Sequence, residues 1–270
     1  MTRESADNGT LLNARRSALV EFVRQRGYAS IAALSTRFKV STQTIRRDIG
    51  LLSEQRILER HHGGAGLPAG TDSLAYTSRR VRHAAAKRRI GDLVAQSIPD
   101  NSSVFIDIGT TTEAVAAALS AHRGLRVVTN HLRVASILSE RTDFEITLSG
   151  GVVRRRDQAV TGAGAARFLE QFRFAYGIFG IGTIGADGAL LDYDYRDVHV
   201  SRTAMDCSRH RFVVMDHSKL GADAMVRLGH LREIHALFMD AAPPAPLLRA
   251  LARNKVVLHL PGSPARARAR

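Results

Sequence analysis

From residue 86 to residue 260, short apolar runs alternate with helix-like segments, and this alternation restricts the fold more than any other feature of the sequence. Such a pattern is typical of a largely parallel sheet covered by helices on both faces. The expected strands cover residues 103–108, 125–129, 144–149, 174–181, 211–216, 236–240 and 255–260. A first helix is expected after Ala86, from the helical spacing of Ile90, Leu93 and Val94. Further helices are expected at residues 111–120, 131–139, 163–172 and 196–208. The sequence therefore predicts an α/β domain.

One junction between a predicted strand and a predicted helix has the composition of an anion-binding site. The apolar run SSVFIDI leads into Gly109, Thr110, Thr111 and Thr112, and the helix-forming run EAVAAAL follows. A strand that ends in this way leaves unpaired backbone N–H groups pointing beyond its end. We expect a negatively charged ligand there, and ordinary capping of the helix by threonine remains the alternative interpretation.

Other candidate ligand contacts also follow predicted strands, because ligands of parallel sheets bind beyond the carboxyl ends of the strands. The candidate segments are DIGTTT (107–112), TN (129–130), SGG (149–151) with Arg154 after it, and DHSK (216–219). A further motif, GIGTIG (180–185), has the spacing of a dinucleotide site. A helix must follow such a site at once, whereas Asp187-Gly188 predicts a hairpin, so we do not expect a dinucleotide there.

Composition limits the class of protein. The single cysteine, Cys207, excludes an intrachain disulfide and a cysteine-based zinc site. No run approaches the roughly 18 apolar residues of a membrane span, and residues 1–10 lack the apolar core of a secretory signal, so we expect a cytoplasmic protein without a membrane partner. The net charge of +14 favours an anionic partner such as nucleic acid or acidic lipid, although a basic proteome would also raise the arginine content.

Most of the first sixty residues carry the periodicity of short helices. Residues 13–26 predict one helix, Ser30 can cap a second, and Ser41 can cap a third, TQTIRRDIGLLSEQ. At 100° per residue, the third helix places Ile45, Ile49 and Leu52 on one buried stripe. A helix, a short helix, a turn and a helix with a polar N-terminal half are typical of a helix-turn-helix protein, although any small three-helix bundle can show a solvated arginine face.

The polar face of the third helix supplies the candidate DNA contacts. Gln43 and Arg47 lie opposite the buried stripe and can bond base edges, while Thr44 and Arg46 lie on its flanks and Arg46 is better placed for a phosphate. The other candidates are Ser41, Thr42, His61 and His62. The two histidines follow a predicted short strand, Ile57 to Arg60, and precede a predicted turn at Gly63-Gly64. We expect phosphate contact or solvent exposure for them and no metal site, since no carboxylate or cysteine lies nearby.

In combination these motifs resemble the DeoR family of bacterial transcription regulators. IRRD, RHHGGA, FIDIGTTTEAV, VTN, LSGG and VVMDHSKLG carry the resemblance, which covers about Ala14 to Leu260. It implies a winged helix-turn-helix at residues 12–66, with the reading motif at 29–48, and a Rossmann-like sensor domain at 86–260 that resembles ribose-5-phosphate isomerase. The residues themselves predict a linker at 67–85, where periodicity lapses, and a basic disordered tail at 261–270, which lies outside the resemblance.

The resemblance also implies roles for the candidate residues. The loop from Gly109 to Thr112 would bind the phosphate of a metabolite through backbone N–H groups and hydroxyls, Lys219 would add a charge, and Arg154 is a weaker candidate for the same contact. Asn130, Asp192 and Asp194 would bond ligand hydroxyls, with a turn or cap role as the alternative for the aspartates. The full set of expected effector residues is Asp107, Gly109, Thr110, Thr111, Thr112, Asn130, Gly150, Gly151, Arg154, Asp192 and Lys219.

The implied protein is a repressor, a homodimer or homotetramer, that leaves double-stranded operator DNA when a phosphorylated effector binds. RHHGGA, SRHRFVVMDHSK and MDAAPPAP are especially similar to family members that regulate glycerol 3-phosphate metabolism, which implies glycerol 3-phosphate as the effector. We expect no catalytic residue, cofactor or metal. Two alternatives remain: a sugar-phosphate isomerase or deaminase, with Asp107, Asp192 or Asp194 as its base, and an architectural DNA-binding protein whose second domain only dimerises.

Overall fold

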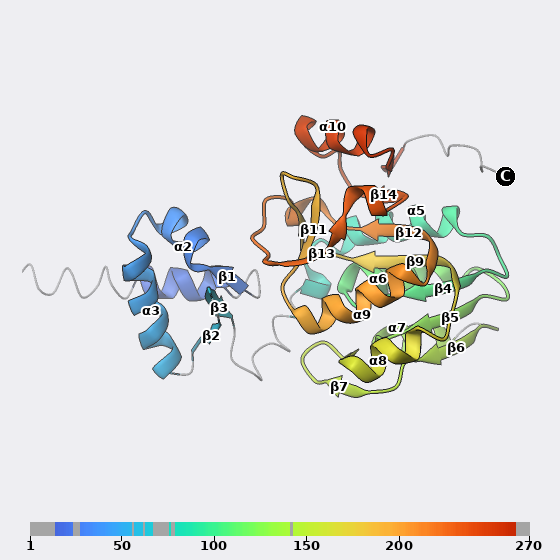
Figure 1. Ribbon diagram of the computed structural model, residues 1–270, viewed down its shortest axis with the longest axis horizontal. Coiled ribbons are helices and arrows are strands. Elements are labelled where there is room, and N and C mark those ends of the chain that lie inside the picture. Colours follow the sequence, from blue (N-terminus) through green and yellow to red (C-terminus); the bar gives the residue numbers. More distant parts are fainter. Residues whose placement is uncertain are drawn as a thin grey trace, which may run out of the picture. The chain divides into compact units, whose positions relative to one another are not determined.

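The computed structural model describes residues 14–23, 28–55, 57–61, 63–66, 76, 79–140 and 143–262. The chain divides into two compact units, Met1–Ser78 and Arg79–Arg270 (Figure 1). Each unit has its own hydrophobic core.

The smaller unit is a winged helix-turn-helix. Its helices are residues 14–23, α2 (Ile31–Phe38) and α3 (Thr42–Glu54). Its sheet has the order β1-β3-β2 and is formed by β1 (Tyr28–Ser30), β2 (Glu59–His61) and β3 (Gly64–Gly66), all antiparallel. The strands β2 and β3 form the wing that the turn at Gly63-Gly64 predicts. The strand β1 was not predicted, because three residues are too few to show a period of two.

Both predicted helix caps of the smaller unit are present. The Ser30 hydroxyl accepts a hydrogen bond from the Ala33 N–H at 3.1 Å, and the Ser41 hydroxyl accepts one from the Thr44 N–H at 3.1 Å. These bonds satisfy N–H groups that a helix cannot pair itself. The caps therefore fix where α2 and α3 begin, and with them the register of the polar face of α3.

The larger unit is built on a seven-stranded parallel sheet with the order β15-β14-β12-β9-β4-β5-β6. Its strands are β4 (Ser103–Ile106), β5 (Arg126–Thr129), β6 (Glu145–Leu148), β9 (Phe174–Gly180), β12 (Ser208–Val214), β14 (Ala236–Phe238) and β15 (Val257–His259). Every strand expected from an apolar run is present, which confirms the predicted α/β fold.

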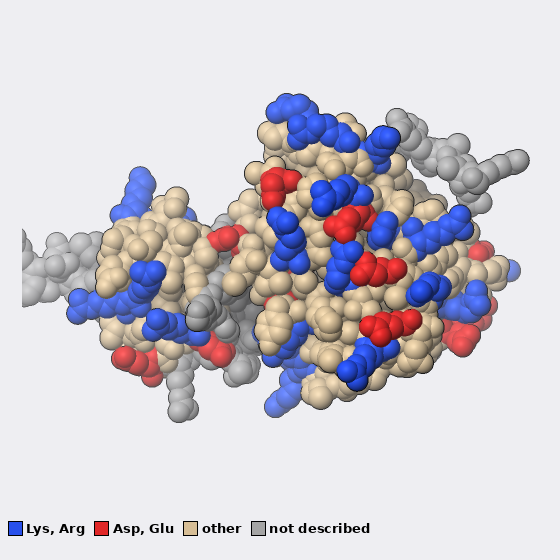
Figure 2. Space-filling model, viewed as in Figure 1, with Lys and Arg blue, Asp and Glu red and all other residues tan. Residues whose placement is uncertain are grey.

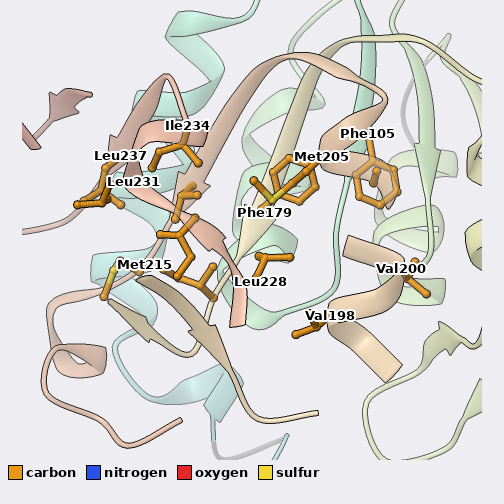
Figure 3. Close-up of a cluster of buried hydrophobic side chains, with 14 of the residues drawn as sticks. Phe105, Phe179, Val198, Val200, Met205, Met215, Leu228, Leu231, Ile234 and Leu237 are labelled. Carbon is orange, nitrogen blue, oxygen red and sulfur yellow. The ribbon is translucent and has the colours of Figure 1, made fainter. Parts of the chain in front are cut away.

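Helices cover both faces of this sheet. One layer contains α5 (Ala84–Ser97), α6 (Thr110–Leu119) and α7 (Leu132–Ser139), and the other contains α8 (Ala163–Leu169), α9 (Tyr195–Asp206) and α10 (Ala245–Arg253). Alternate residues of β4 enter opposite cores: Val104 and Ile106 pack with the first layer, and Phe105 with the second. Figure 3 shows Phe105 among the second cluster, with Phe179 and Met205.

Two small antiparallel sheets lie beside the parallel one. The first joins β10 (Thr183–Ile184), β11 (Ala189–Asp192) and β13 (Val226–His230). Gly188 has a φ of 86° in the turn between β10 and β11, so a hairpin follows GIGTIG as predicted and no helix begins there. The second pairs β7 (Val152–Arg154) with β8 (Ala159–Thr161). Within the described ranges, no helix is both long and apolar enough to cross a membrane.

Candidate functional site

The helix α3 presents the polar face that the wheel calculation predicted. Gln43, Arg46 and Arg47 are exposed, whereas Ile45 and Ile49 are buried in the core of the smaller unit. An added Cβ at Gly50 would meet no atom within 4 Å, so this position also faces open space. The exposed side therefore offers two guanidinium groups, one amide and a flat stretch of backbone at Gly50, which suits contact with a DNA groove.

Asp48, on the same helix, is a buried carboxylate. Its two oxygens accept hydrogen bonds from Arg15 Nε at 2.8 Å and Arg16 Nε at 3.0 Å. Burial raises the pKa of Asp48, but the hydrogen bonds and charges of Arg15 and Arg16 outweigh that effect and lower it. The pair ties α3 to the helix at residues 14–23. The periodicity could have indicated it, because Asp48 lies beside Ile45 and Ile49 on the buried stripe.

The predicted contacts in the wing lie partly outside the described residues. His61 is the last residue of β2 and pairs with Gly64 across the hairpin. His62 is not among the described residues. Ser41, Thr42 and Thr44 surround the start of α3, and the Ser41 hydroxyl is within 2.9 Å of the Thr44 hydroxyl. The caps therefore leave Thr42 and Gln43 as the first exposed side chains of α3.

In the larger unit, four neighbouring strands bring their carboxyl ends together in the order β9-β4-β5-β6. The structure places a buried polar side chain after each strand: Thr183 after β9, Thr111 after β4, Asn130 after β5 and Ser149 after β6. Within the described part of the chain, one oxygen of each has no hydrogen-bond partner. A buried polar atom without a partner costs roughly 1–3 kcal/mol, so this row of atoms is suited to a bound polar molecule.

The loop between β4 and α6 has the geometry of an anion site. Gly109 is the N-cap residue of α6 and has a φ of 133°, a conformation that favours glycine. The first N–H groups of α6 have no partner within the helix and point beyond its end. The Thr111 hydroxyl is the orphan of this loop, whereas the Thr112 hydroxyl donates to the Gly109 carbonyl at 2.7 Å. Thr110 begins the helix. The loop thus offers N–H groups and the Thr111 hydroxyl to an anion.

Two carboxyl groups lie near this loop, the buried Asp107 and the half-buried Asp192. Asp107 accepts hydrogen bonds from the Ser201 hydroxyl at 2.6 Å and the Ile108 N–H at 2.8 Å. Burial raises the pKa of Asp107 to about 7 against the lowering effect of these bonds, and the charges of Asp197 and Asp192 add to the rise. Burial also raises the pKa of Asp192, which accepts a bond from the Tyr193 N–H at 2.7 Å. Asp107 can thus hold a proton near neutrality, and a protonated carboxyl tolerates an anion nearby.

Lys219 follows β12 in the short helix η1 (His217–Lys219). Its Nζ donates to the Ile181 carbonyl, at the end of β9, at 2.7 Å. Burial lowers the pKa of Lys219, while the charges of Asp216 and Asp192 raise it and that of Arg79 lowers it further. One N–H of the ammonium is therefore used in the fold, and the group lies within the field of the Asp192 carboxylate.

Arg154 is fully engaged with carboxylates. Its guanidinium bonds Asp157 at 2.7 and 2.8 Å, Asp197 at 2.8 Å and Asp194 at 3.1 Å. Burial lowers the pKa of Arg154, but these carboxylates outweigh it and raise the pKa. Asp194 also caps α9 by accepting from the Arg196 N–H at 2.9 Å. We therefore assign Arg154 and Asp194 to anchoring the β7–β8 hairpin on α9, in preference to ligand contact.

The two glycines after β6 differ from each other. An added Cβ at Gly151 would lie 2.8 Å from a Val160 methyl, and the residue has a φ of 142°. Gly151 is thus required where the chain enters the β7–β8 hairpin. An added Cβ at Gly150 would meet nothing within 4 Å. Ser149 lies in the segment SGG (149–151), which was expected to contact a ligand, although its side chain was given no role of its own. Thr183 was missed, because a single hydroxyl residue after a strand is a common turn residue and carries no spacing signal.

Figure 2 shows Lys and Arg on the visible surface of both units, with acidic residues among them on the larger unit. The net charge of +14 therefore does not by itself show which surface binds DNA. Among the described residues, no three His, Cys, Asp or Glu side chains are grouped as metal ligands would be. The groups that the sheet edge offers are the N–H groups at the start of α6 and the oxygens of Thr183, Thr111, Asn130 and Ser149.

Two family models match the chain. The DeoR-like helix-turn-helix domain matches residues 15–71, and the DeoR C terminal sensor domain matches residues 82–241. Among solved structures, ribose 5-phosphate isomerase A from Methanocaldococcus jannaschii is 9% identical, with a TM-score of 0.39, over 51% of this chain and 55% of that one. A likeness as loose as this carries no functional argument.

Several curated relatives are similar over nearly their whole length. The glycerol-3-phosphate regulon repressor of Escherichia coli strain K12 is 44% identical over 246 residues, which cover 91% of this chain and 98% of that protein. The protein of the same name from Haemophilus influenzae is 43% identical, over 85% and 89% of the two chains. The HTH-type transcriptional repressor CsqR of Escherichia coli is 41% identical, over 92% and 95%. This chain therefore belongs to the DeoR family of helix-turn-helix transcriptional regulators.

Proposed function

We propose that this protein is a transcriptional repressor that binds double-stranded operator DNA and is released by glycerol 3-phosphate. The observation that carries the proposal is the row of unpartnered oxygens on Thr183, Thr111, Asn130 and Ser149, beside the N-terminus of α6, in a chain that also contains a helix-turn-helix unit. The names of the relatives support the choice of effector, since two of them are glycerol-3-phosphate regulon repressors.

The row of unpartnered oxygens suits one orientation of the effector, with its phosphate at the N-terminus of α6. The phosphate would accept hydrogen bonds from the N–H groups of Thr110, Thr111 and Thr112 and from the Thr111 hydroxyl. Lys219 would supply positive charge from the neighbouring loop. The two hydroxyl groups of the glycerol part would then face the Asn130 amide oxygen, which accepts hydrogen bonds, and the Ser149 and Thr183 hydroxyls, which donate and accept them.

The remaining expected residues frame this site. Gly109 permits the turn into α6, and Gly150 leaves room for the ligand after β6. Asp107 and Asp192 would present protonated or hydrogen-bonded carboxyls to the hydroxyl end. Gly151 and Arg154 would act through the β7–β8 hairpin, as the preceding contacts indicate.

On the DNA side, Gln43 and Arg47 would contact base edges and Arg46 a phosphate, while Ser41, Thr42 and Thr44 would lie near the backbone. His61 and His62 would contact phosphates from the wing. We propose a homodimer or homotetramer acting in the cytoplasm, because helix-turn-helix proteins bind paired half-sites through two-fold symmetry. We also propose domains at residues 12–66 and 86–260 and a linker at 67–85, whereas the tail expected at 261–270 lies almost wholly outside the described residues.

A sugar-phosphate isomerase is the second candidate function, and Asp107 is the observation that favours it. A buried carboxyl whose pKa is raised to about 7 is suited to act as a general base. However, both oxygens of Asp107 already accept hydrogen bonds from Ser201 and Ile108. We therefore favour the regulator, which needs no base.

The test is operator release. A duplex selected by the protein from random sequence is labelled, and its affinity is measured with and without glycerol 3-phosphate, glycerol, inorganic phosphate and phosphorylated three- to six-carbon metabolites. Release by glycerol 3-phosphate alone supports the proposal. Release only by another phosphorylated metabolite replaces the effector, and turnover of ribose 5-phosphate or glucosamine 6-phosphate favours the enzyme. A protein whose DNA affinity responds to no metabolite would be an architectural protein.

A further inference from the structure

The start of the larger unit is held by residues that adjoin the candidate effector site in sequence. Residues 79–83, which we call the strap, directly follow the smaller unit and precede α5. Arg80 Nε lies 3.3 Å from Oε2 of the buried Glu113, and Glu113 directly follows Thr112 in the first turn of α6. We propose that the strap is the element through which effector binding changes the affinity for DNA. This inference rests on the proposed function.

A second contact holds the strap from α5. The ammonium of the buried Lys87 donates hydrogen bonds to the carbonyl oxygens of Arg79 and Arg82, the latter at 2.8 Å. Burial lowers the pKa of Lys87 to about 8, against the charge of Asp216, and the charge of Lys219 adds to the lowering. Lys87 thus binds the strap backbone, and its pKa depends on the charges of Asp216 and Lys219 in the DHSK loop.

A third contact comes from that same loop. The rings of His83 and His217 meet edge to face, with centroids 5.2 Å apart. His217 lies two residues before Lys219, and its Nδ1 is 2.7 Å from Asp240 Oδ2. His83 itself has a φ of 55°, a left-handed conformation that a residue with a Cβ keeps only where its surroundings hold it. The last residue of the strap, His83, therefore keeps an uncommon backbone conformation while its ring contacts one of the effector loops.

The loops that would bind the ligand are therefore the same loops that contact the strap. A phosphate bound by the N-terminus of α6 and by Lys219 would touch both loops that hold the strap, one through Glu113 and the other through His217. A shift of either loop would alter the contacts that hold the strap in position. The strap is in turn continuous in the chain with the smaller unit. A ligand alters DNA affinity only if it binds the two strap arrangements with different affinity, and such coupling is commonly about 5- to 150-fold.

A double-mutant cycle tests the link. Operator affinity is measured with and without saturating glycerol 3-phosphate for wild type, Arg80→Gln, Glu113→Gln and the double variant, with Arg88→Gln as a control that removes an exposed charge from α5. Each single variant should keep its ligand-free operator affinity and its affinity for glycerol 3-phosphate but lose about 2- to 30-fold of the release ratio. The double variant should lose no more than either single variant. Wild-type release ratios in all variants would overturn the proposal.

A second measurement needs no effector, so it separates the strap from the choice of glycerol 3-phosphate. Coupling between two sites is reciprocal, so operator DNA alone should change amide hydrogen exchange at residues 79–83 and 109–113 of the wild-type protein. In the double variant, the change at 109–113 should vanish while the protection of 42–47 by DNA remains. If operator DNA alters exchange at 42–47 but nowhere between 79 and 113 in wild type, the strap does not transmit the signal, whatever the effector is.

Discussion

Asp107, at the end of β4, accepts a 2.6 Å hydrogen bond from the hydroxyl of Ser201, which lies on α9 on the opposite face of the sheet from α6. The bond connects the loop that begins α6 with the helix that carries the second core layer. The carboxyl group is nearly fully buried, at 1% exposure, and that burial raises its pKa to about 7. The candidate effector site therefore contains a buried carboxyl group, Asp107, that titrates near neutral pH.

Asp107 makes stability depend on pH. Because its pKa is higher in the folded state, its proton stabilises the fold fully below about pH 4, and this contribution is lost as the pH rises through about 7. The difference in unfolding free energy between wild type and Asp107→Asn should thus fall by up to about 4 kcal/mol between those limits. Denaturant unfolding at several pH values measures it. Parallel pH profiles of the two proteins would show that Asp107 titrates normally.

Asp48 should stabilise the DNA-binding unit through Arg15 and Arg16. Its pKa is lowered in the fold, so its contribution is present above about pH 4 and is lost as the pH falls below that value. Asp48→Asn should weaken charge-assisted hydrogen bonds and lower stability by about 1.5–3 kcal/mol at neutral pH. Thermal unfolding, with the exposed Asp92→Asn as control, checks this. An equal melting temperature for the two variants would mean that the Asp48 pairs contribute nothing.

The two arginines of α3 should differ in their effect on DNA binding. Arg47→Ala should cost roughly 1–3 kcal/mol on the operator and relax base preference, because Arg47 lies opposite the buried stripe. Arg46→Ala should weaken all sequences alike and reduce the salt slope by about one unit. Salt titrations on operator and random duplexes distinguish the two. The assignment of the faces is wrong if base preference depends on Arg46 and not on Arg47.

Two helical glycines should respond oppositely to alanine. At Gly91, an added Cβ would lie 2.6 Å from the Ala114 carbonyl oxygen, so Gly91→Ala should force α5 from α6 and destabilise the larger unit by about 1–3 kcal/mol. At Gly50 the space is open, so Gly50→Ala should stabilise α3 by up to about 1 kcal/mol while weakening operator binding. Unfolding curves and operator titrations test both. Unchanged DNA affinity in Gly50→Ala would show that α3 does not approach DNA at that position.

The sheet was predictable from sequence because a parallel strand buried on both faces leaves an apolar run that few other structures share. The caps at Ser30 and Ser41 were predictable because serine is preferred at the residue before a helix, where its hydroxyl accepts a hydrogen bond from a backbone N–H of the first turn. The strands β7, β8 and β13 were not predicted, since they are short, partly exposed and paired antiparallel with segments that the local pattern cannot identify.

The candidate site was predicted only in part, for a related reason. The loop from Gly109 to Thr112 carries its own signal, a glycine and three hydroxyls between a strand and a helix. Ser149 already stands in the candidate segment SGG, whereas Thr183 becomes a candidate only when the order β9-β4-β5-β6 places it beside that loop. The sequence also does not show that Arg154 is surrounded by three carboxylates, because two of them lie about 40 positions away.

Thr111→Val tests the central claim most directly, because the claim makes two opposite demands on one hydroxyl. Without ligand, removing a buried oxygen that lacks a partner should leave stability unchanged or raise it. Thr112→Val, the matched control, should lower stability because the Thr112 hydroxyl bonds the Gly109 carbonyl. Both proteins should still bind operator.

The decisive measurement is the glycerol 3-phosphate concentration that releases half of the operator from wild type and from Thr111→Val. Loss of one charge-assisted hydrogen bond to phosphate should raise this concentration about ten- to hundredfold in Thr111→Val. Release of the variant at the wild-type concentration would contradict the account and place the effector away from the N-terminus of α6.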